Sequence, residues 1–336
     1  MPDDGTLRET DIRPDALMVG QADRLAADLR RLLERRDEFV GVGCPACGST
    51  EWLPGLEKWT LSYVRCVVCE SLYMSPRPTP ELLADYHANS QNYAYWNEKI
   101  FPASEGVRRE RIFRPRAERV AELCGRFGVE TRTLIDVGAG FGTFCEEVRD
   151  LGLFDRVIAV EPTPQLAQTC RQRGLDVIAE PVEHINLPAE SVDVVTSFEV
   201  IEHVFAPRTL VEACATLLTP GGLLVLTCPN GRGFDVLTLL ERSSVIDNEH
   251  LNYFNPSSLA RLVADCGLDV LETTTPGRLD AELVRKEALD GGVELDPFLQ
   301  LVLVERWDEL GEPFQRFLAE HQLSSHMWLV ARRPPS

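Results

Sequence analysis

Short apolar runs alternate with amphipathic segments over the C-terminal two-thirds of the chain. The runs at 134–137, 157–160 and 223–228 are rich in Val, Leu and Ile, as in strands that are buried on both faces. Helical spacing follows the first of these runs, at 144–151. Strands that alternate with helices predict an α/β fold with a doubly wound parallel sheet.

Three glycines stand directly after the first of these runs. Gly138, Gly140 and Gly142 occupy every second position, and their missing side chains let a ligand come close to the backbone. Asp136 interrupts the apolar run, and a buried carboxylate is costly unless it has partners. The second run ends in Glu161, where doubly wound folds hold a ribose diol. These residues predict a nucleotide-type cofactor, and they fit NAD and S-adenosylmethionine (SAM) equally well.

Further motifs separate the two cofactors. The chain resembles the class I SAM-dependent methyltransferases over residues 131–275, where the glycine turn, the acid at 161, Asp-Val-Val-Thr-Ser-Phe-Glu at 193–199 and Thr-Pro-Gly-Gly at 219–222 follow in the order of that family. The resemblance implies SAM as the cofactor and a Rossmann-like, seven-stranded sheet whose antiparallel edge would lie at 270–275 and 327–331. It also implies that the following residues bind SAM: Asp136, Gly138, Ala139, Gly140, Gly142, Glu161, Pro162, Val182 and Phe198.

The run Glu-Val-Ile-Glu-His at 199–203 begins where the strand predicted at 191–199 ends. Apolar spacing over 200–204 predicts a helix, which would put Glu199, Glu202 and His203 on one side of its first turn. That turn lies at the carboxyl edge of the sheet, where doubly wound folds bind ligands. Three hypotheses remain open: the carboxylates complement the helix dipole, His203 is the general base for a substrate hydroxyl, or the cluster binds a divalent ion.

A second histidine bears on this cluster. His250 lies in Asn-Glu-His-Leu-Asn-Tyr-Phe at 248–254, after the fifth strand, and would return to the same edge of the sheet. Glu-x-x-Glu-His followed by a later His resembles the ubiquinone-biosynthesis O-methyltransferases and the small-RNA 2′-O-methyltransferases. That resemblance implies a metal, such as Mg2+, held by Glu199, Glu202, His203 and His250. We expect His203, His250 and Glu199 to carry catalysis, with a general base or substrate positioning as the first hypothesis.

Four cysteines near the start form two Cys-x-x-Cys pairs, Cys44 with Cys47 and Cys66 with Cys69. Two pairs at this spacing can place four thiolates around one Zn2+. Because four protein ligands leave no open position, such a zinc ion would support folding rather than catalysis. Disulfides are the alternative, which a cytoplasmic chain disfavours. The pattern predicts a zinc-ribbon-like module with a small hairpin at 52–64.

Composition divides the chain into parts. The expected parts are an N-terminal helical segment at 1–38, the zinc-ribbon-like module at 39–80, an aromatic linker and active-site cap at 81–130, and the SAM-binding domain at 131–336. The amphipathic helix expected at 15–38 could pack on the core or make a homodimer contact. An insertion at 280–322 has helical spacing and, with the cap, would wall the acceptor pocket.

Length and charge limit the classes of protein. A chain of 336 residues with 44% apolar and 26% charged residues is typical of a globular protein. No apolar stretch approaches the about 20 residues that a membrane span needs. The net charge of −19 argues against DNA as a partner. The acidic start Met-Pro-Asp-Asp-Gly is unlike a signal peptide, so we expect a cytoplasmic protein.

The zinc module narrows the expected substrate only by resemblance. A Cys-x-x-Cys module followed by the Pro-Arg-Pro-Thr-Pro connector at 76–80 and a SAM domain is similar to bacterial methyltransferases of sugar and polysaccharide pathways. This resemblance implies O-methylation of a sugar or glycan precursor. The alternatives are a quinone or polyketide-type small molecule as acceptor, or a non-catalytic scaffold in which the zinc ribbon binds another protein.

Overall fold

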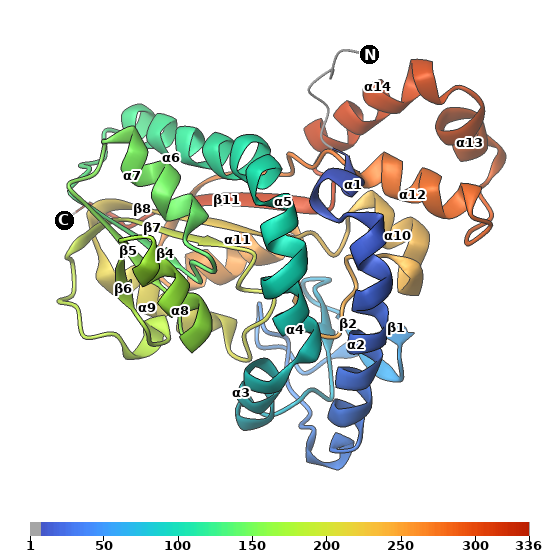
Figure 1. Cartoon of the computed structure of the whole chain (residues 1–336), viewed down its shortest axis with the longest axis horizontal. Coiled ribbons are helices and arrows are strands. Elements are labelled where there is room, and N and C mark those ends of the chain that lie inside the picture. Colours follow the sequence, from blue (N-terminus) through green and yellow to red (C-terminus); the bar gives the residue numbers. More distant parts are fainter. Residues whose placement is uncertain (1–7, 336) are drawn as a thin grey trace.

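The computed structural model describes residues 8–335, so the first seven residues of the segment expected at 1–38 lie outside it. Its centre is a seven-stranded sheet flanked by helices (Figure 1). The strand order is β10 (Asp269–Thr274), β11 (His326–Arg332), β8 (Leu218–Pro229), β7 (Val192–Phe198), β4 (Thr133–Val137), β5 (Arg156–Val160) and β6 (Asp176–Ile178). The predicted doubly wound fold is confirmed.

The strand directions also follow the prediction. Strands β4 to β8 run parallel to one another, whereas β11 is antiparallel to both β8 and β10. The antiparallel edge expected at 270–275 and 327–331 is therefore present, with bounds shifted by one residue. From β4 the chain winds outward through β5 and β6, and it then crosses back to β7 on the other side of β4. The carboxyl ends of β4 and β7 therefore flank the switch point of the sheet.

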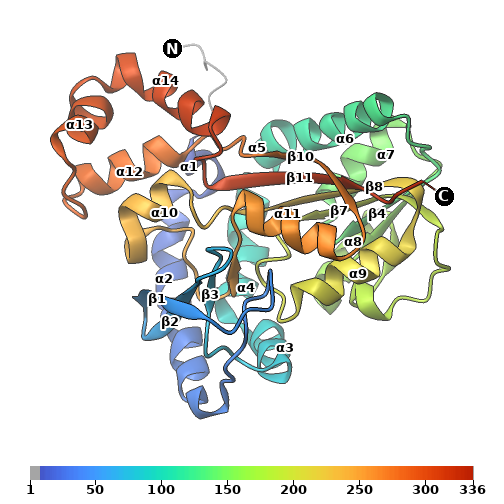
Figure 2. The same cartoon turned by 180° about the vertical axis from the view of Figure 1, so that it is seen from behind.

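Helices cover both faces of this sheet. One face packs against α6 (Arg114–Phe127), α7 (Thr143–Leu151) and α8 (Pro164–Gln172). The other face packs against α9 (Pro207–Leu217) and α11 (Pro256–Asp265), which Figure 2 shows from behind. Strands between two helical layers must be apolar on both faces, which explains the unbroken apolar runs of the sequence.

The cysteine region forms a smaller sheet of its own. It contains β1 (Trp52–Lys58), β2 (Leu61–Cys66) and β3 (Leu72–Met74), so the predicted hairpin is present. Its fourth strand, β9 (Asn252–Tyr253), comes from the methyltransferase-like half and pairs with β3. The module is therefore joined to the segment that carries His250.

The N-terminal helices lie against the segment expected to cap the site (Figure 1). They are α1 (Glu9–Ile12) and α2 (Asp15–Leu33), and the segment contains α3 (Pro80–Asn89), α4 (Gln91–Tyr95) and α5 (Phe101–Arg108). The first long helix packs on the same chain, and the homodimer contact stays a prediction. The ring of Phe101 stacks on Phe141 in the glycine turn, with ring centroids 3.8 Å apart.

The inserted segment forms a separate helical cluster beyond the sheet (Figure 2). It contains α12 (Asp280–Leu289), α13 (Pro297–Gln300) and α14 (Trp307–Glu320), which pack on α10 (Phe234–Leu239). His326, the first residue of β11, follows this cluster and reaches the carboxyl edge of the sheet. None of the helices described between residues 8 and 335 has the length and apolarity that crossing a membrane requires.

Candidate active site and metal centres

The glycine turn is shaped for close approach of backbone and ligand. Gly138, Gly140 and Gly142 have φ angles of +78°, +56° and +74°, which favour glycine. A Cβ atom on Gly138 would lie 2.3 Å from Cγ2 of Val200, and one on Gly142 would lie 2.4 Å from Cδ1 of Leu175. A Cβ on Gly140 would meet no atom within 4 Å. Two glycines thus allow packing, and the middle one borders open space.

Two buried carboxylates lie beside this turn, and one of them bonds to it. Glu161, 4% exposed, accepts hydrogen bonds from the backbone N–H groups of Gly140 and Thr163, both at 2.8 Å. Asp136 accepts from the Thr196 hydroxyl at 2.7 Å. Burial raises the pKa of Glu161, and it raises the pKa of Asp136 to about 7. Both acids lie at the carboxyl ends of their strands, and their roles toward SAM stay predictions.

The remaining residues expected to bind SAM lie around the same edge of the sheet. Ala139 is half-buried within the turn, Pro162 is exposed directly after Glu161, and Val182 is 4% exposed in the apolar core. Phe198 packs edge-on against Phe144, with ring centroids 4.8 Å apart. Their roles toward SAM stay predictions.

The spacing of the glycines allows a test of the turn. We expect Gly138→Ala to abolish measurable SAM binding, because the new methyl group would overlap Val200 and the φ of +78° would be strained. Gly152→Ala is the matched control, since Gly152 also has a positive φ, +63°, but has open space at its Cβ position. Isothermal titration with SAM should leave the affinity of Gly152→Ala unchanged. Wild-type affinity in Gly138→Ala would contradict the assigned packing.

The helix predicted at the start of the 199–204 segment is absent. Glu199 has a φ of +56°, residues 201–203 form a turn, and the helix begins only at Pro207. The reason is distant in sequence: the Asn252 side-chain amide donates to the carbonyl groups of Ile201, Glu202 and Val204 at 2.9 to 3.3 Å. Carbonyls that bond to Asn252 do not form the hydrogen bonds of a first helical turn.

Three of the four residues predicted to bind a metal still lie together. One ligand atom each from Glu202, His203 and His250 can be chosen so that all lie within 4.8 Å of one another. His203 Nδ1 donates to the Glu249 carbonyl at 3.1 Å, and His250 Nδ1 donates to the Val245 carbonyl at 2.9 Å. Because a carbonyl only accepts, each neutral ring keeps its Nε2 lone pair free. Such outer hydrogen bonds are typical of histidines that bind metals.

Glu202 is the most unusual member of the three. The residue is 0% exposed, and neither carboxylate oxygen has a hydrogen-bond partner among the described residues. Burial, and then the nearby charge of Glu199, raise its pKa well above the usual range. Burial also lowers the pKa of His203, so that imidazole stays neutral. A buried carboxylate without partners, beside two free imidazole nitrogens, fits a cation.

Glu199 points to a different set of partners. Its Oε1 atom accepts from the Thr227 hydroxyl at 2.6 Å, and it lies 3.2 Å from Arg116 Nη2 and 3.4 Å from His326 Nδ1. Although burial acts to raise the pKa of Glu199, His326 and Arg116 lower it, so the carboxylate is charged. The four-ligand set implied by the sequence is therefore divided: Glu199 joins Arg116 and His326, and the other three residues stay together.

Helices α3 and α4 form a wall against Glu249, whose carbonyl orients His203, and sequence analysis did not identify the polar contacts of this wall. The Tyr86 hydroxyl and the Asn92 amide both donate to Oε1 of Glu249, at 3.3 and 3.4 Å. The His87 ring packs edge-on against Tyr86, with ring centroids 5.9 Å apart. The high aromatic content of 81–130 pointed to this segment, but no local pattern indicated these particular partners.

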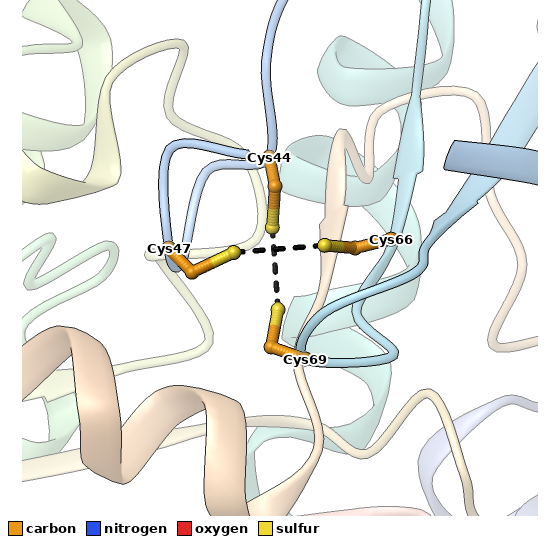
Figure 3. A group of neighbouring side chains, drawn as sticks. All are labelled: Cys44, Cys47, Cys66 and Cys69. Atoms are coloured by element: carbon orange, nitrogen blue, oxygen red, sulfur yellow. Dashed lines mark hydrogen bonds between the residues drawn. The ribbon is translucent and has the colours of Figure 1, made fainter. Parts of the chain in front are cut away.

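The four cysteines meet as predicted (Figure 3). Their sulfur atoms lie within 4.8 Å of one another, with Cys44–Cys69 at 3.3 Å and Cys47–Cys66 at 3.5 Å. Zinc–sulfur bonds of about 2.3 Å in a tetrahedron give sulfur separations of about 3.8 Å, so the four thiols fit one zinc ion. None of the cysteines between residues 8 and 335 forms a disulfide.

The two cysteine turns have matching backbones. The N–H of Gly48 donates to the Cys44 carbonyl at 2.8 Å, and the N–H of Glu70 donates to the Cys66 carbonyl at 3.0 Å. Gly48 and Glu70 hold the same place in their turns and both have positive φ, +74° and +59°. In the second turn, the Val68 N–H also donates to the Cys66 sulfur at 3.4 Å, as expected of a thiolate that binds metal.

Comparison with known proteins defines the class. Residues 108–273 match the protein family described as a methyltransferase domain. A "Ubiquinone biosynthesis O-methyltransferase" of Cupriavidus pinatubonensis is 29% identical over 46% of this chain and 67% of that protein. A protein of Mycolicibacterium smegmatis named "Probable S-adenosylmethionine-dependent methyltransferase" is 27% identical over 57% of this chain and 71% of its own length.

A solved structure of a SAM-dependent methyltransferase from Archaeoglobus fulgidus aligns with 71% of this chain and 99% of its own, at 18% identity and a TM-score of 0.48. The family match and the seven-stranded sheet show that the chain carries a class I methyltransferase domain. The chain is a SAM-dependent methyltransferase, which argues against the alternative of a non-catalytic scaffold.

Proposed function

We propose that this enzyme methylates a hydroxyl group of a small molecule that carries a second oxygen beside it, such as a catechol or a vicinal diol. The observation that carries this proposal is the buried, unpartnered carboxylate of Glu202 beside the free Nε2 atoms of His203 and His250. This group would hold a divalent cation, and a cation with three protein ligands keeps positions open for acceptor oxygens.

The donor set also bears on which cation would bind. The sequence suggested Mg2+ on the basis of two carboxylates and two histidines. With Glu199 turned to Arg116, the remaining set is two imidazoles and one carboxylate. Imidazole ligands suit first-row transition metals such as Fe2+, Ni2+ and Zn2+, and carboxylate ligands suit Mn2+ and Mg2+. Of the two ions that suit the carboxylate, Mn2+ is the first-row transition metal, so it fits the mixed set better than Mg2+ does. We therefore propose Mn2+ as the first cation to test and Mg2+ as the second.

The residues of the chain have separate tasks in this proposal. The glycine turn and Glu161 would hold SAM, which supplies a methyl group on a positively charged sulfur. Val200, in contact with Gly138, links the cofactor turn to the Glu202 loop, so both substrates are positioned by adjoining backbone. Such positioning supplies much of the rate of a displacement reaction. A bound cation would lower the pKa of the acceptor hydroxyl.

A second role for His203 is favoured by one observation. Its ring is 26% exposed and its pKa lies well below the usual value because of burial. A neutral imidazole with a free Nε2 can accept the acceptor's proton without a metal. This role stays an alternative to the cation site within the same proposed reaction.

The sequence predicts either a sugar or a quinone-type molecule as the methyl acceptor, and the relatives bear on this choice. The name of the Cupriavidus relative supports O-methylation of a quinone precursor, at 29% identity. The sugar pathway rests on the resemblance of the zinc module alone, and neither relative reported above is named for such a pathway. We therefore place a phenolic acceptor first and a sugar second. The four cysteines are proposed to bind one structural Zn2+.

Two measurements test the proposed function. Isothermal titration should show heat with SAM and none with NAD, because the glycine turn and Glu161 lie within a methyltransferase domain. Methyl transfer from labelled SAM should then be measured with 3,4-dihydroxybenzoate as a catechol probe and UDP-glucose as a sugar probe, each with Mn2+. Turnover of the catechol supports the first acceptor class and turnover of the sugar supports the second. Transfer to a monohydroxylated analogue at the same rate would contradict the requirement for adjacent oxygens.

A further inference from the structure

We propose that the N-terminal helix α2 completes the acceptor site through Asp28, a positioning residue that fixes the wall formed by α3 and α4. The inference deepens the proposed O-methyltransferase function and rests on the acceptor lying between this wall and His203. It assigns a task to a helix that the sequence left without one.

Asp28 is a buried carboxylate whose hydrogen bonds all go to one turn; its Oδ1 atom also lies 3.8 Å from Nη2 of Arg31 on the same helix. The residue is 1% exposed, and its Oδ2 atom accepts from the Ser90 hydroxyl and the Asn92 N–H, both at 2.8 Å. Its Oδ1 atom accepts from the Gln91 N–H at 3.1 Å. These N–H groups belong to the first turn of α4, where free donors and the helix dipole both favour a negative charge. Asp28 thus fixes where α4 starts.

A chain of hydrogen bonds leads from Asp28 to His203. The Asn92 side-chain amide donates to Oε1 of Glu249 at 3.4 Å, and the backbone carbonyl of Glu249 accepts from His203 Nδ1 at 3.1 Å. Asn92 and Glu249 are 5% and 8% exposed, so water offers them little replacement for these bonds. A shift of α4 would therefore reach the residue that orients the imidazole.

A branch of the same network leaves hydrogen-bond acceptors unused. The Tyr86 hydroxyl donates to Glu249, so its oxygen accepts from the Asn248 amide nitrogen at 2.7 Å. The side-chain NH2 groups of Asn92 and Asn248 donate to this network, whereas their Oδ1 atoms take no part in it. Neither Asn92 Oδ1 nor Asn248 Oδ1 has a hydrogen-bond partner among the described residues, and both are buried. Two free acceptors beside a site for a hydroxylated molecule suit its hydroxyl groups.

Helix α2 is also packed tightly enough to hold its position. The Tyr95 hydroxyl at the end of α4 donates to the Leu17 carbonyl at 3.1 Å, and the Arg24 guanidinium lies 4.1 Å from the centre of the Tyr95 ring. A Cβ atom on Gly20 would lie 2.6 Å from the Tyr95 hydroxyl. Helix α4 is thus held by α2 at both ends, at Asp28 and at Leu17.

The test compares Asp28→Asn with Asp23→Asn in the full-length, zinc-loaded enzyme. Asp23 is an exposed carboxylate on the same helix and serves as the matched control. In Asp28→Asn an NH2 group replaces one carboxylate oxygen, and this donor would face the N–H and O–H donors of residues 90–92. We expect the KM for 3,4-dihydroxybenzoate to rise roughly 10- to 100-fold, as for a misplaced binding group. The affinity for SAM should change much less than this KM, because the hydrogen bonds of Asp28 reach the first turn of α4 and not the glycine turn.

Hydrogen exchange gives a second readout that needs no acceptor. Amides at 86–95 and at 245–252 should exchange faster in Asp28→Asn than in Asp23→Asn, while amides at 133–142 should be unchanged. Asn92→Ala cuts the chain of hydrogen bonds one step later and leaves α2 intact, so it should reproduce the faster exchange at 245–252. Faster exchange confined to α2 and 86–95, or a KM equal to that of Asp23→Asn, would overturn the inference.

The two proposals fail in different ways. If the wild-type enzyme methylates neither the catechol nor the sugar probe, the proposed function is wrong in its acceptor. The exchange at 245–252 then still decides whether Asp28 positions the loop beside His203.

Discussion

Cys66→Ser should cost the protein most of its zinc and lower its free energy of unfolding by more than about 4 kcal/mol, the range in which loss of a metal site falls. The four sulfurs lie within 4.8 Å of one another, so each ligand belongs to one closed set. Metal analysis of the wild-type protein should find about one zinc ion per chain. Chemical unfolding followed by circular dichroism measures the change in stability.

Loss of zinc should also affect the loop at 243–250, because the cysteine module is bonded to this loop. Lys58 Nζ, at the end of β1, donates to the carbonyl groups of Ser243 and Ile246 at 2.9 and 2.8 Å. The Tyr63 hydroxyl, on β2, donates to the Asp247 carbonyl at 2.9 Å. These bonds precede His250 directly. We therefore expect Cys66→Ser to lower methyl transfer more than it lowers the affinity for SAM.

Cys266→Ser is the matched control for this experiment. Cys266 is a half-buried single cysteine outside the module, and its substitution should leave both the zinc content and the stability near wild type. A Cys66→Ser protein that kept one zinc ion and its full stability would contradict the structural role. Equal losses of SAM affinity and of methyl transfer would show that the module does not act through the 243–250 loop.

The fold could be predicted from the sequence because its signals are local. The apolar runs at 134–137 and 157–160 are continuous, as strands between two helical layers require, and each is found as a strand. The glycine turn was equally legible, because positive φ and close packing at Gly138 leave few other residues possible. The zinc cysteines follow the same logic, since their spacing fixes two tight turns.

The candidate site was predicted less completely because its geometry depends on residues far apart in sequence. The periodicity at 200–204 favoured a helix, but Asn252 takes the carbonyl groups that this helix would need. The same non-local effect separates Glu199, which turns to Arg116, from Glu202. Patterns within one segment carry no information about hydrogen bonds that arrive from another segment.

Glu202→Gln should stabilise the protein when no divalent cation is present and abolish the stabilisation that a cation provides. Without a cation, the raised pKa of Glu202 means that folding at neutral pH must add a proton to this carboxylate, and neither of its oxygens has a hydrogen-bond partner among the described residues. Both effects cost free energy. An amide of the same shape is neutral in the unfolded and the native state, so it avoids the cost of the proton. With Mn2+ bound, the wild-type carboxylate gains its partner. The neutral amide is a weaker direct ligand, so the cation affinity should fall by at least the roughly 10- to 100-fold that loss of an outer partner of a ligand costs. Thermal unfolding with and without Mn2+ measures both effects.

Glu212→Gln serves as the control, because Glu212 is exposed on α9 and its change should alter neither value. The zinc content must be confirmed after removal of other metals with a chelator, so that the cysteine module stays intact. A Glu202→Gln protein with the cation response of the wild type would contradict a cation site at this carboxylate.

Methyl-transfer rates then distinguish a bound cation from His203 acting alone as the general base. Both roles predict that His203→Ala lowers the methyl-transfer rate by roughly 10²- to 10⁴-fold, since the ring contributes its free Nε2 in either case. They differ for His250→Ala, which removes a cation ligand but leaves the proton acceptor in place. If a cation acts, excess Mn2+ should partly restore His250→Ala, and chelator-treated wild type should be inactive until Mn2+ is added. If His203 acts alone as the base, chelation should leave the rate unchanged, and added Mn2+ should rescue neither variant.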